Sequence, residues 1–351
     1  MSQVHNNVSI SFSLQKWYEI NKRDLPWRKA TDPYIIWISE IILQQTRVNQ
    51  GHDYFIRFTN RFPDVESLAK TTEEEVLKLW QGLGYYSRAR NLHTASKQIV
   101  TDFKGKFPES HQDILSLKGV GEYTAAAISS IAFNQPYTVV DGNVNRVISR
   151  LFRVENKKEI TVFAQTILDT KDPGTHNQAL MELGALVCTP QNPLCYDCPI
   201  ANFCEAYINN EVPKYPIKKV AQKNRNRYFN YFHIIYDENT YIRKRKGKDI
   251  WLNLYEFPLI ETPKQINLSE LIGHEQYIKL FGNLSQLDLS RILLIKHILT
   301  HQTIYATFYQ IKIPVTQQFR IGEEFLSIKE KYLEKYPISR LIHKYLEKCQ
   351  E

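Results

Sequence analysis

Apolar residues recur at helical spacing from residue 12 to about residue 206. Between residues 35 and 48, for example, Ile35, Ile38, Ile41, Ile42 and Val48 follow the helical repeat. Four residue pairs with proline in second position mark breaks between such segments: Asp32-Pro33, Phe62-Pro63, Phe107-Pro108 and Asp172-Pro173. The pattern predicts a mainly α-helical N-terminal domain of several short helices.

The pattern changes beyond Tyr228. Alternating apolar and polar residues predict β-strands over residues 228–236, 240–245 and 304–313, with Asp237-Glu238-Asn239 as a hairpin loop. Residues 324–347 return to helical spacing, so the second domain is predicted to be α+β. Residues 212–227 are rich in Pro, Lys and Arg, and contain no acidic residue. They predict a basic linker, either a solvated spacer or one that also contacts phosphates, between domains at 1–211 and 228–351.

Composition and charge narrow the class of protein. A chain of 351 residues exceeds what one hydrophobic core usually organises, which supports two domains. Its formal net charge of +8 favours a polyanionic partner such as nucleic acid. Residues 1–30 contain no apolar signal-peptide core, and no stretch is long and apolar enough for a membrane span. We therefore expect a cytoplasmic, nucleoid-associated protein without membrane contact.

Four of the five cysteines lie close together. Cys188, Cys195, Cys198 and Cys204 have the spacing C-x6-C-x2-C-x5-C, and only Cys349 lies elsewhere. Thiolates gathered in one short loop bind metal, and disulfides are disfavoured in a reducing interior. Zinc is one alternative, but four-cysteine zinc sites usually contain two C-x2-C pairs. The spacing favours an iron–sulfur cluster.

Two glycines separate helical segments at Leu117-Lys118-Gly119-Val120-Gly121. Glycine permits a tight turn and a close approach to another molecule, and the amides that open the next helix favour a phosphate group. An ordinary helix–helix turn would also explain the pair. In a basic chain, Lys118, Gly119, Val120 and Gly121 are candidates for a helix–hairpin–helix motif that binds the DNA backbone.

Two acidic residues occupy positions that suit chemistry. Glu40 lies in the apolar helical run 37–43, where burial would raise its pKa and allow it to act as a general acid, although a water-facing position fits as well. Asp141 follows an apolar run and precedes a helix, so it is also a candidate N-cap. A protonated and an ionised carboxyl group that share one cleft are the usual means of breaking a glycosidic bond.

Several segments of the chain resemble those of MutY-type adenine DNA glycosylases, members of the helix–hairpin–helix (endonuclease III) superfamily. They are residues 25–28 (LPWR), 39–46 (SEIILQQT), 82–92 (GLGYYSRARNL), 119–126 (GVGEYTAA), 140–143 (VDGN) and the cysteine loop. The resemblance implies removal of adenine paired with 8-oxoguanine or guanine in double-stranded DNA. It also implies a structural [4Fe–4S] cluster, which would fold the loop and present backbone and basic groups to DNA.

The same resemblance implies roles for individual residues. Glu40 would protonate the flipped adenine and then help to activate water, and Asp141 would stabilise the sugar cation. Tyr123 stands where endonuclease III-type enzymes carry a nucleophilic lysine; as a catalytic residue, its phenol would assist cleavage and shield the intermediate. The absence of that lysine implies a monofunctional enzyme that leaves an abasic site. The adenine pocket would be lined by Trp27, Arg28 and Gln178, and Asn143 would support Asp141. The base stack opened by the flipped adenine would be filled by Gln45 and Tyr85. Packing in the core for Trp27 and an exposed helical position for Gln178 are the alternatives.

The second domain resembles the MutT/Nudix-like domain of the same family over residues 251–258 and 296–301. It contains no Nudix box, so we expect recognition of the lesion by Thr300 and His301 rather than nucleotide hydrolysis. Lys118 and Leu299-Thr300 depart from the family pattern of a proline and an aromatic-Ser pair.

Two other functional classes fit parts of the sequence: an endonuclease III-like lyase acting on oxidised pyrimidines, and a DNA-binding module without enzymatic activity. We expect a monomer on DNA, with replication or repair proteins as further candidate partners.

Overall fold

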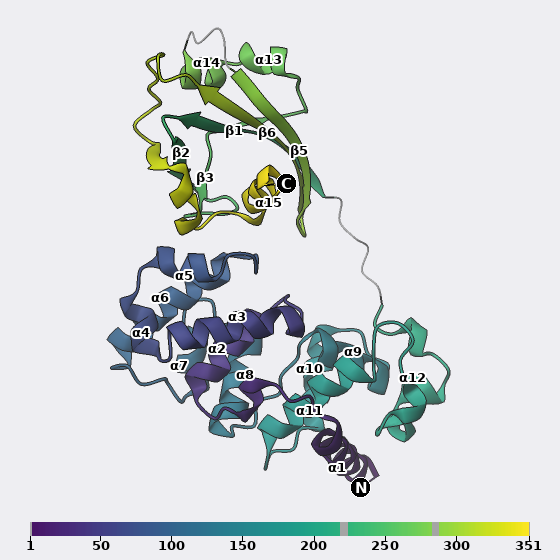
Figure 1. The fold of residues 1–351 in the computed structure, drawn as a ribbon. Coiled ribbons are helices and arrows are strands. Elements are labelled where there is room, and N and C mark those ends of the chain that lie inside the picture. The colour runs from purple at the N-terminus through teal and green to yellow at the C-terminus, as the bar shows by residue number, and fades with distance from the viewer. Residues whose placement is uncertain (1, 218–223, 283–287, 351) are drawn as a thin grey trace. The chain divides into compact units, whose positions relative to one another are not determined.

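The computed structural model describes residues 2–217, 224–282 and 288–350. Its contacts divide the chain into two compact units (Figure 1). Unit 1 comprises Met1–Lys70 and Asn91–Val220, and unit 2 comprises Thr71–Arg90 and Ala221–Glu351. The domain limits expected at residues 211 and 228 remain a prediction. The contacts also place Thr71–Arg90 in the same unit as the C-terminal part of the chain.

Unit 1 is built from helices, as the apolar spacing predicts. Its helices are α1 (Ser2–Asn21), η1 (Pro26–Lys29), α2 (Pro33–Leu43), α3 (Val48–Arg61), α4 (Val65–Lys70), α7 (His111–Ser116), α8 (Glu122–Phe133), α9 (Gly142–Phe152), α10 (Lys157–Thr166), α11 (Pro173–Leu186) and α12 (Glu205–Ile208), and it also holds most of α6 (Ser87–Asp102). Two of the predicted breaks are helix starts: Asp32 and Asp172 are N-caps, and each precedes a proline in the first turn.

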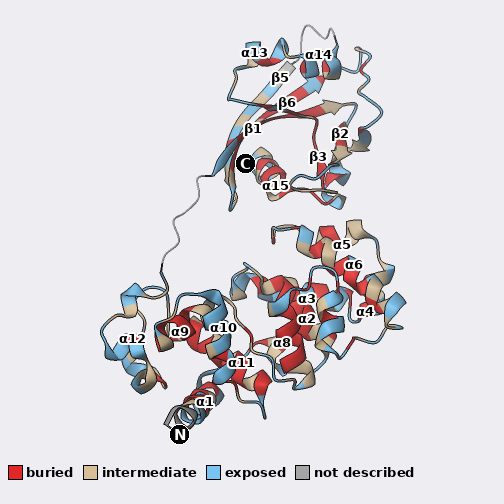
Figure 2. Ribbon diagram, turned by 180° about the vertical axis from the view of Figure 1, so that it is seen from behind, coloured by how far each residue is buried: buried red, intermediate tan, exposed pale blue. Residues whose placement is uncertain are grey.

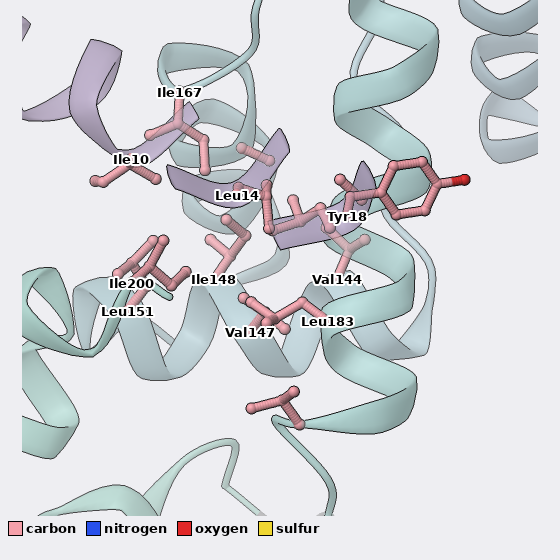
Figure 3. Close-up of a cluster of buried hydrophobic side chains, with 14 of the residues drawn as sticks. Ile10, Leu14, Tyr18, Val144, Val147, Ile148, Leu151, Ile167, Leu183 and Ile200 are labelled. Carbon is pink, nitrogen blue, oxygen red and sulfur yellow. The ribbon is translucent and has the colours of Figure 1, made fainter. Parts of the chain in front are cut away.

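One core of unit 1 lies between α1, α9, α10 and α11 (Figure 3). Ile10 and Leu14 of α1 pack there against Val147 and Ile148 of α9 and Leu183 of α11. Next to it, α8 packs against both α2 and α11. Much of α8 is buried (Figure 2), including its small residues at 125–127. This packing brings together α2, α8, the start of α9 and α11, and each of these helices carries a candidate site residue.

Unit 2 contains a mixed sheet. Its elements are α5 (Glu73–Leu79), β1 (Arg225–Tyr236), β2 (Asn239–Lys244), β3 (Tyr255–Glu256), β4 (Leu259–Thr262), α13 (Leu268–Ile272), α14 (Glu275–Phe281), β5 (Asp288–Ile298), β6 (Gln302–Ile313), β7 (Leu326–Lys329), η5 (Glu330–Lys335) and α15 (Arg340–Gln350). The main strand order is β3-β2-β1-β6-β5, in which β1 and β6 are parallel and the other neighbours antiparallel. The α+β architecture and the three predicted strands are confirmed.

The two faces of this sheet have different aromatic cores. On one face, Tyr345 of α15 stacks on Phe308 with ring centroids 4.2 Å apart. On the other, Phe232 packs against Tyr277 and Phe281 of α14.

No helix among the described residues is long and apolar enough to span a membrane.

Two details of the sequence prediction change. Asn239 belongs to β2, so the hairpin loop is only Asp237-Glu238, and both residues have positive φ, as a two-residue turn between strands requires. The prediction of helix over residues 324–347 is wrong for its first part, because Leu326–Lys329 forms strand β7 and pairs with β2. Only α15 has regular α-helical structure there. Pairing with a strand distant in sequence outweighed the local pattern.

Candidate active site

A cavity of about 230 Å³ opens in unit 1 where η1, α2, α8, α9 and α11 meet. Candidate residues from five separate segments line it: Trp27, Arg28, Glu40, Tyr123, Asp141, Asn143 and Gln178. The two acidic candidates, which lie about a hundred positions apart in the chain, therefore share one cavity.

Glu40 is buried within α2, with only 8% of its surface exposed, and it lines the cavity. The hydroxyl of Tyr123 donates a hydrogen bond to Glu40 Oε2 at 2.5 Å. Burial raises the pKa of Glu40 to about 7; the hydrogen bond from Tyr123 opposes this rise, and the negative charge of Asp141 adds to it. A large fraction of Glu40 is therefore protonated near neutral pH, as a general acid requires.

Asp141 is held by the start of α9. Its Oδ1 accepts a hydrogen bond from the backbone N–H of Val144 at 2.7 Å, and its Oδ2 accepts one from Asn143 Nδ2 at 3.0 Å. Burial raises the pKa of Asp141, whereas these hydrogen bonds favour the ionised form. Asp141 thus caps α9 and also lines the cavity. Backbone N–H donors stabilise the negative charge of Asp141, and Glu40 has no such donors among the described residues.

Tyr123 lies in the first turn of α8. Burial, the nearby Glu40 and their hydrogen bond raise its pKa well above the ordinary value, so its hydroxyl keeps its proton. It acts on Glu40 as a hydrogen-bond donor.

Part of the cavity wall is organised by a buried acid that the sequence pattern did not reveal. Glu182 of α11 accepts hydrogen bonds from Arg28 at 2.6 and 2.9 Å, and from both the backbone and the side chain of Arg23. Burial raises the pKa of Glu182, but the bonds from Arg23 and Arg28 outweigh this and lower it to about 2. Glu182 lies four positions after Gln178 on the same helical face, a signal that could have identified it.

Trp27 and Gln178 complete this wall. Trp27 is buried and packs edge-on against Phe55, with centroids 5.3 Å apart, so it both belongs to the core and lines the cavity. Gln178 Oε1 accepts a hydrogen bond from the hydroxyl of Tyr18 at 2.8 Å. The expected pocket residues thus lie together.

The glycine turn joins α7 to α8. Gly119 has φ +79°, and a Cβ atom there would lie 2.5 Å from Cβ of Asn91, so only glycine fits without a shift. Gly121 is the N-cap of α8, Val120 is buried beneath the turn, and Lys118 is exposed. The first backbone N–H groups of α8 therefore follow an exposed turn, which suits a phosphate contact.

The remaining DNA-binding candidates do not line this cavity. Gln45 follows α2, is exposed and has φ 57°. Tyr85, also at positive φ, belongs to unit 2, where it lines a separate cavity with Thr300 and His301, and its hydroxyl is hydrogen-bonded to Thr300 Oγ1. Thr300 and His301 form the turn between β5 and β6.

The four clustered cysteines line one small cavity in unit 1, together with Arg150 and Tyr207. The loop that carries them contains η2 (Cys195–Asp197) and η3 (Ala201–Phe203), and it leads through α12 to η4 (Val212–Lys214). Arg150 donates to Cys188 Sγ at 3.3 Å and to the carbonyl of Thr189 at 2.8 Å. Within the described residues, no three His, Cys, Asp or Glu side chains form a recognisable metal site.

Arg146 connects the cysteine loop to the carboxyl pair. It donates to the carbonyl of Cys188 at 2.7 Å, to the carbonyl of Gly184 at 2.7 Å and to Asn143 Oδ1 at 2.9 Å. Asn143 in turn donates to Asp141. Helix α9 thereby links the position of Asp141 to the fold of the cysteine loop, a connection that the sequence did not reveal.

Comparisons with known proteins agree with this geometry. Residues 38–168 match the model of the HhH-GPD superfamily of base excision DNA repair proteins, and residues 230–348 match the NUDIX domain. A protein of Buchnera aphidicola (subsp. Schizaphis graminum) named adenine DNA glycosylase is 38% identical over 254 residues, 70% of this chain and 73% of that protein. The human adenine DNA glycosylase is 43% identical over 210 residues, 55% of this chain and 38% of that protein.

Solved structures share the helical fold. A thermostable thymine-DNA glycosylase superposes with a TM-score of 0.56 at 29% identity, covering 60% of this chain and all of that one. An endonuclease III bound to DNA gives a TM-score of 0.51 at 20% identity, covering 58% of this chain and 97% of that one. At that identity the second likeness concerns the fold alone.

Proposed function

The chain belongs to the adenine DNA glycosylases, enzymes of base excision repair, and we propose that it hydrolyses the glycosidic bond of adenine paired with 8-oxoguanine or guanine in double-stranded DNA. One observation carries the catalytic part of this proposal: Glu40, with its raised pKa, shares a cavity with the hydrogen-bonded carboxylate of Asp141. Because the relatives are named adenine DNA glycosylases, a lyase that acts on oxidised pyrimidines is not favoured.

The reaction requires the adenine to leave the base stack and enter the cavity. Glu40 then donates its proton to a ring nitrogen, which turns the base into a neutral leaving group. As the glycosidic bond breaks, positive charge develops on the sugar, and the carboxylate of Asp141 stabilises it. The Glu40 carboxylate accepts a proton from the attacking water, while Asn143 keeps Asp141 in place.

The product is an abasic site in an intact strand. Strand cleavage through a Schiff base needs an amine nucleophile in the cavity. No lysine is among the described residues that line it, and the phenol of Tyr123 is directed at Glu40. These features support a monofunctional enzyme.

The rate of base release should fall as pH rises through about 7, because Glu40 is active only when protonated. The hydrogen bond from Tyr123 lowers the pKa of Glu40, so Tyr123→Phe should move this alkaline limb to higher pH. Single-turnover rates between pH 5 and 9 would measure both effects. A limb that stays at the same pH in the variant would show that Tyr123 does not tune Glu40.

A panel of duplexes tests the substrate assignment. Base release should be fastest for adenine opposite 8-oxoguanine, measurable opposite guanine, and absent opposite thymine. Equal rates for all three partners, or release of an oxidised pyrimidine in place of adenine, would contradict it.

Recognition of 8-oxoguanine is assigned to the turn Leu299-Thr300-His301, because Thr300 and His301 are exposed and Thr300 is hydrogen-bonded to Tyr85. Gln45 and Tyr85 would fill the stack that the flipped adenine leaves, and the turn Lys118–Gly121 would bind the backbone. Gln45, Tyr85, Lys118, Gly119 and Gly121 are exposed and available to DNA, whereas the side chain of Val120 is buried.

A [4Fe–4S] cluster fits the cysteine cavity chemically. Its four donors are thiol sulfurs, the ligands that such clusters use, and Arg150 supplies a positive charge beside Cys188. Cys188, Cys195, Cys198 and Cys204 would hold it, and its contribution would be to fold the loop. The loop cannot itself present cations to DNA, since residues 188–204 include no Lys or Arg; backbone groups remain available for that contact.

Metal content is a direct prediction of this assignment. Protein purified without oxygen should contain iron and acid-labile sulfide in equal amounts, and Cys198→Ser should lose both together with thermal stability. Elemental analysis would distinguish the alternatives, because zinc without sulfide would overturn the cluster. Cys349→Ser is the matched control and should leave the iron content unchanged.

A further inference from the structure

Tyr18 of α1 is a buried residue behind the cavity wall, with 3% of its surface exposed. It contacts two residues that do line the cavity. Its hydroxyl donates to Gln178 Oε1 at 2.8 Å, and the guanidinium of Arg28 lies over its ring, 5.5 Å from the centroid. Tyr18 therefore connects two parts of the wall without lining the cavity itself.

The hydrogen bond engages one end of the Gln178 amide and leaves the other end for a bound base. A side-chain amide has a carbonyl acceptor and an NH2 donor, and rotation exchanges them. With Oε1 engaged by Tyr18, Nε2 is the free end, and it has no hydrogen-bond partner within the described part of the chain. The cavity is thereby offered an N–H donor.

The position of Tyr18 is itself firmly determined. Leu14, one helical turn earlier in α1, and Ile10 before it are buried in the core shared with α9 and α11. Burial also raises the pKa of Tyr18, so its hydroxyl remains protonated and able to donate. A donor held in this way restricts rotation of the Gln178 side chain. An exposed glutamine would keep that rotational freedom.

We propose that Tyr18 is a positioning residue for base recognition, which fixes the Gln178 amide so that its N–H group meets a ring nitrogen of the flipped adenine. Adenine offers unprotonated ring nitrogens as acceptors. This inference rests on the proposed function, because it assumes that adenine occupies the cavity. It extends the recognition site to a helix that does not touch the base.

A double-mutant cycle tests the proposal. Tyr18→Phe keeps the ring beneath Arg28 and removes only the hydroxyl, and it should lower the single-turnover rate of adenine release about fivefold. Gln178→Ala should lower the rate by at least as much. In the Gln178→Ala background, Tyr18→Phe should have no further effect, because its target is gone. Neither residue transfers a proton, so all four rates should remain measurable.

The possible outcomes separate this inference from the function itself. Equal losses from Tyr18→Phe in both backgrounds would mean that the hydroxyl acts through the fold, and no loss in either would mean that it does not position Gln178; each result overturns the proposal. Melting temperatures of the four proteins would show any loss of stability. A wild-type protein that releases no adenine from any duplex would instead refute the proposed function.

Discussion

Glu40→Gln should lower the single-turnover rate of adenine release by about a thousandfold or more while leaving DNA affinity unchanged. Glutamine has nearly the same shape and can still accept the hydrogen bond from Tyr123, but it cannot donate the acidic proton that makes adenine a leaving group. Quenched-flow release from a duplex with adenine opposite 8-oxoguanine would measure the rate. Fluorescence anisotropy on the same duplex would measure binding.

Glu159→Gln provides the matched control for this variant. Glu159 lies on α10, is exposed and does not line the cavity, so the same change of charge there should leave release unaltered. If Glu40→Gln keeps a rate close to that of the wild type, Glu40 is not the general acid. If both variants lose activity together, the effect belongs to net charge rather than to the site.

Asp141→Asn should lower the rate by about a hundredfold to a thousandfold with little change in stability. Asparagine caps a helix about as well as aspartate, so the start of α9 should persist. What disappears is the negative charge that stabilises the developing sugar cation. Single-turnover kinetics and thermal melting, measured on the same preparation, would separate the two effects.

Asp172→Asn is a close control, because Asp172 caps α11 in the same way through the backbone N–H of Thr175 but does not line the cavity. A second measurement isolates the charge: wild type should bind a duplex with a cationic azasugar at the target position more tightly than one with a neutral abasic analogue. Asp141→Asn should lose that preference. An unchanged preference in the variant would remove Asp141 from this role.

The sequence predicted those parts of the molecule that depend on local pattern. The run Trp37–Leu43 is apolar on nearly every side, which favoured burial of Glu40, but the sequence left a water-facing position equally open. Asp141 was recognisable as an N-cap because an apolar segment precedes it and helical spacing follows it. The glycine turn at Gly119 was recognisable for a similar reason, since few other residues adopt its conformation.

The contacts that tune the site could not be predicted in this way. Tyr123 is 83 residues from Glu40, and Glu182 is 154 residues from Arg28, so each pair meets only through the packing of separate helices. The left-handed conformations of Gln45 and Tyr85 carry no glycine signal either. Strand β7 was missed because its pairing partner, β2, lies far away in sequence.

The central claim is that this chain removes adenine by hydrolysis at its own carboxyl pair and leaves the strand intact. The most direct test measures free adenine and strand length in one time course, on a duplex with adenine opposite 8-oxoguanine and borohydride in half of the samples. We predict that adenine appears while the strand stays whole until alkali is added, with no covalent protein–DNA adduct. Strand cleavage in step with base release, together with efficient capture by borohydride, would contradict the account.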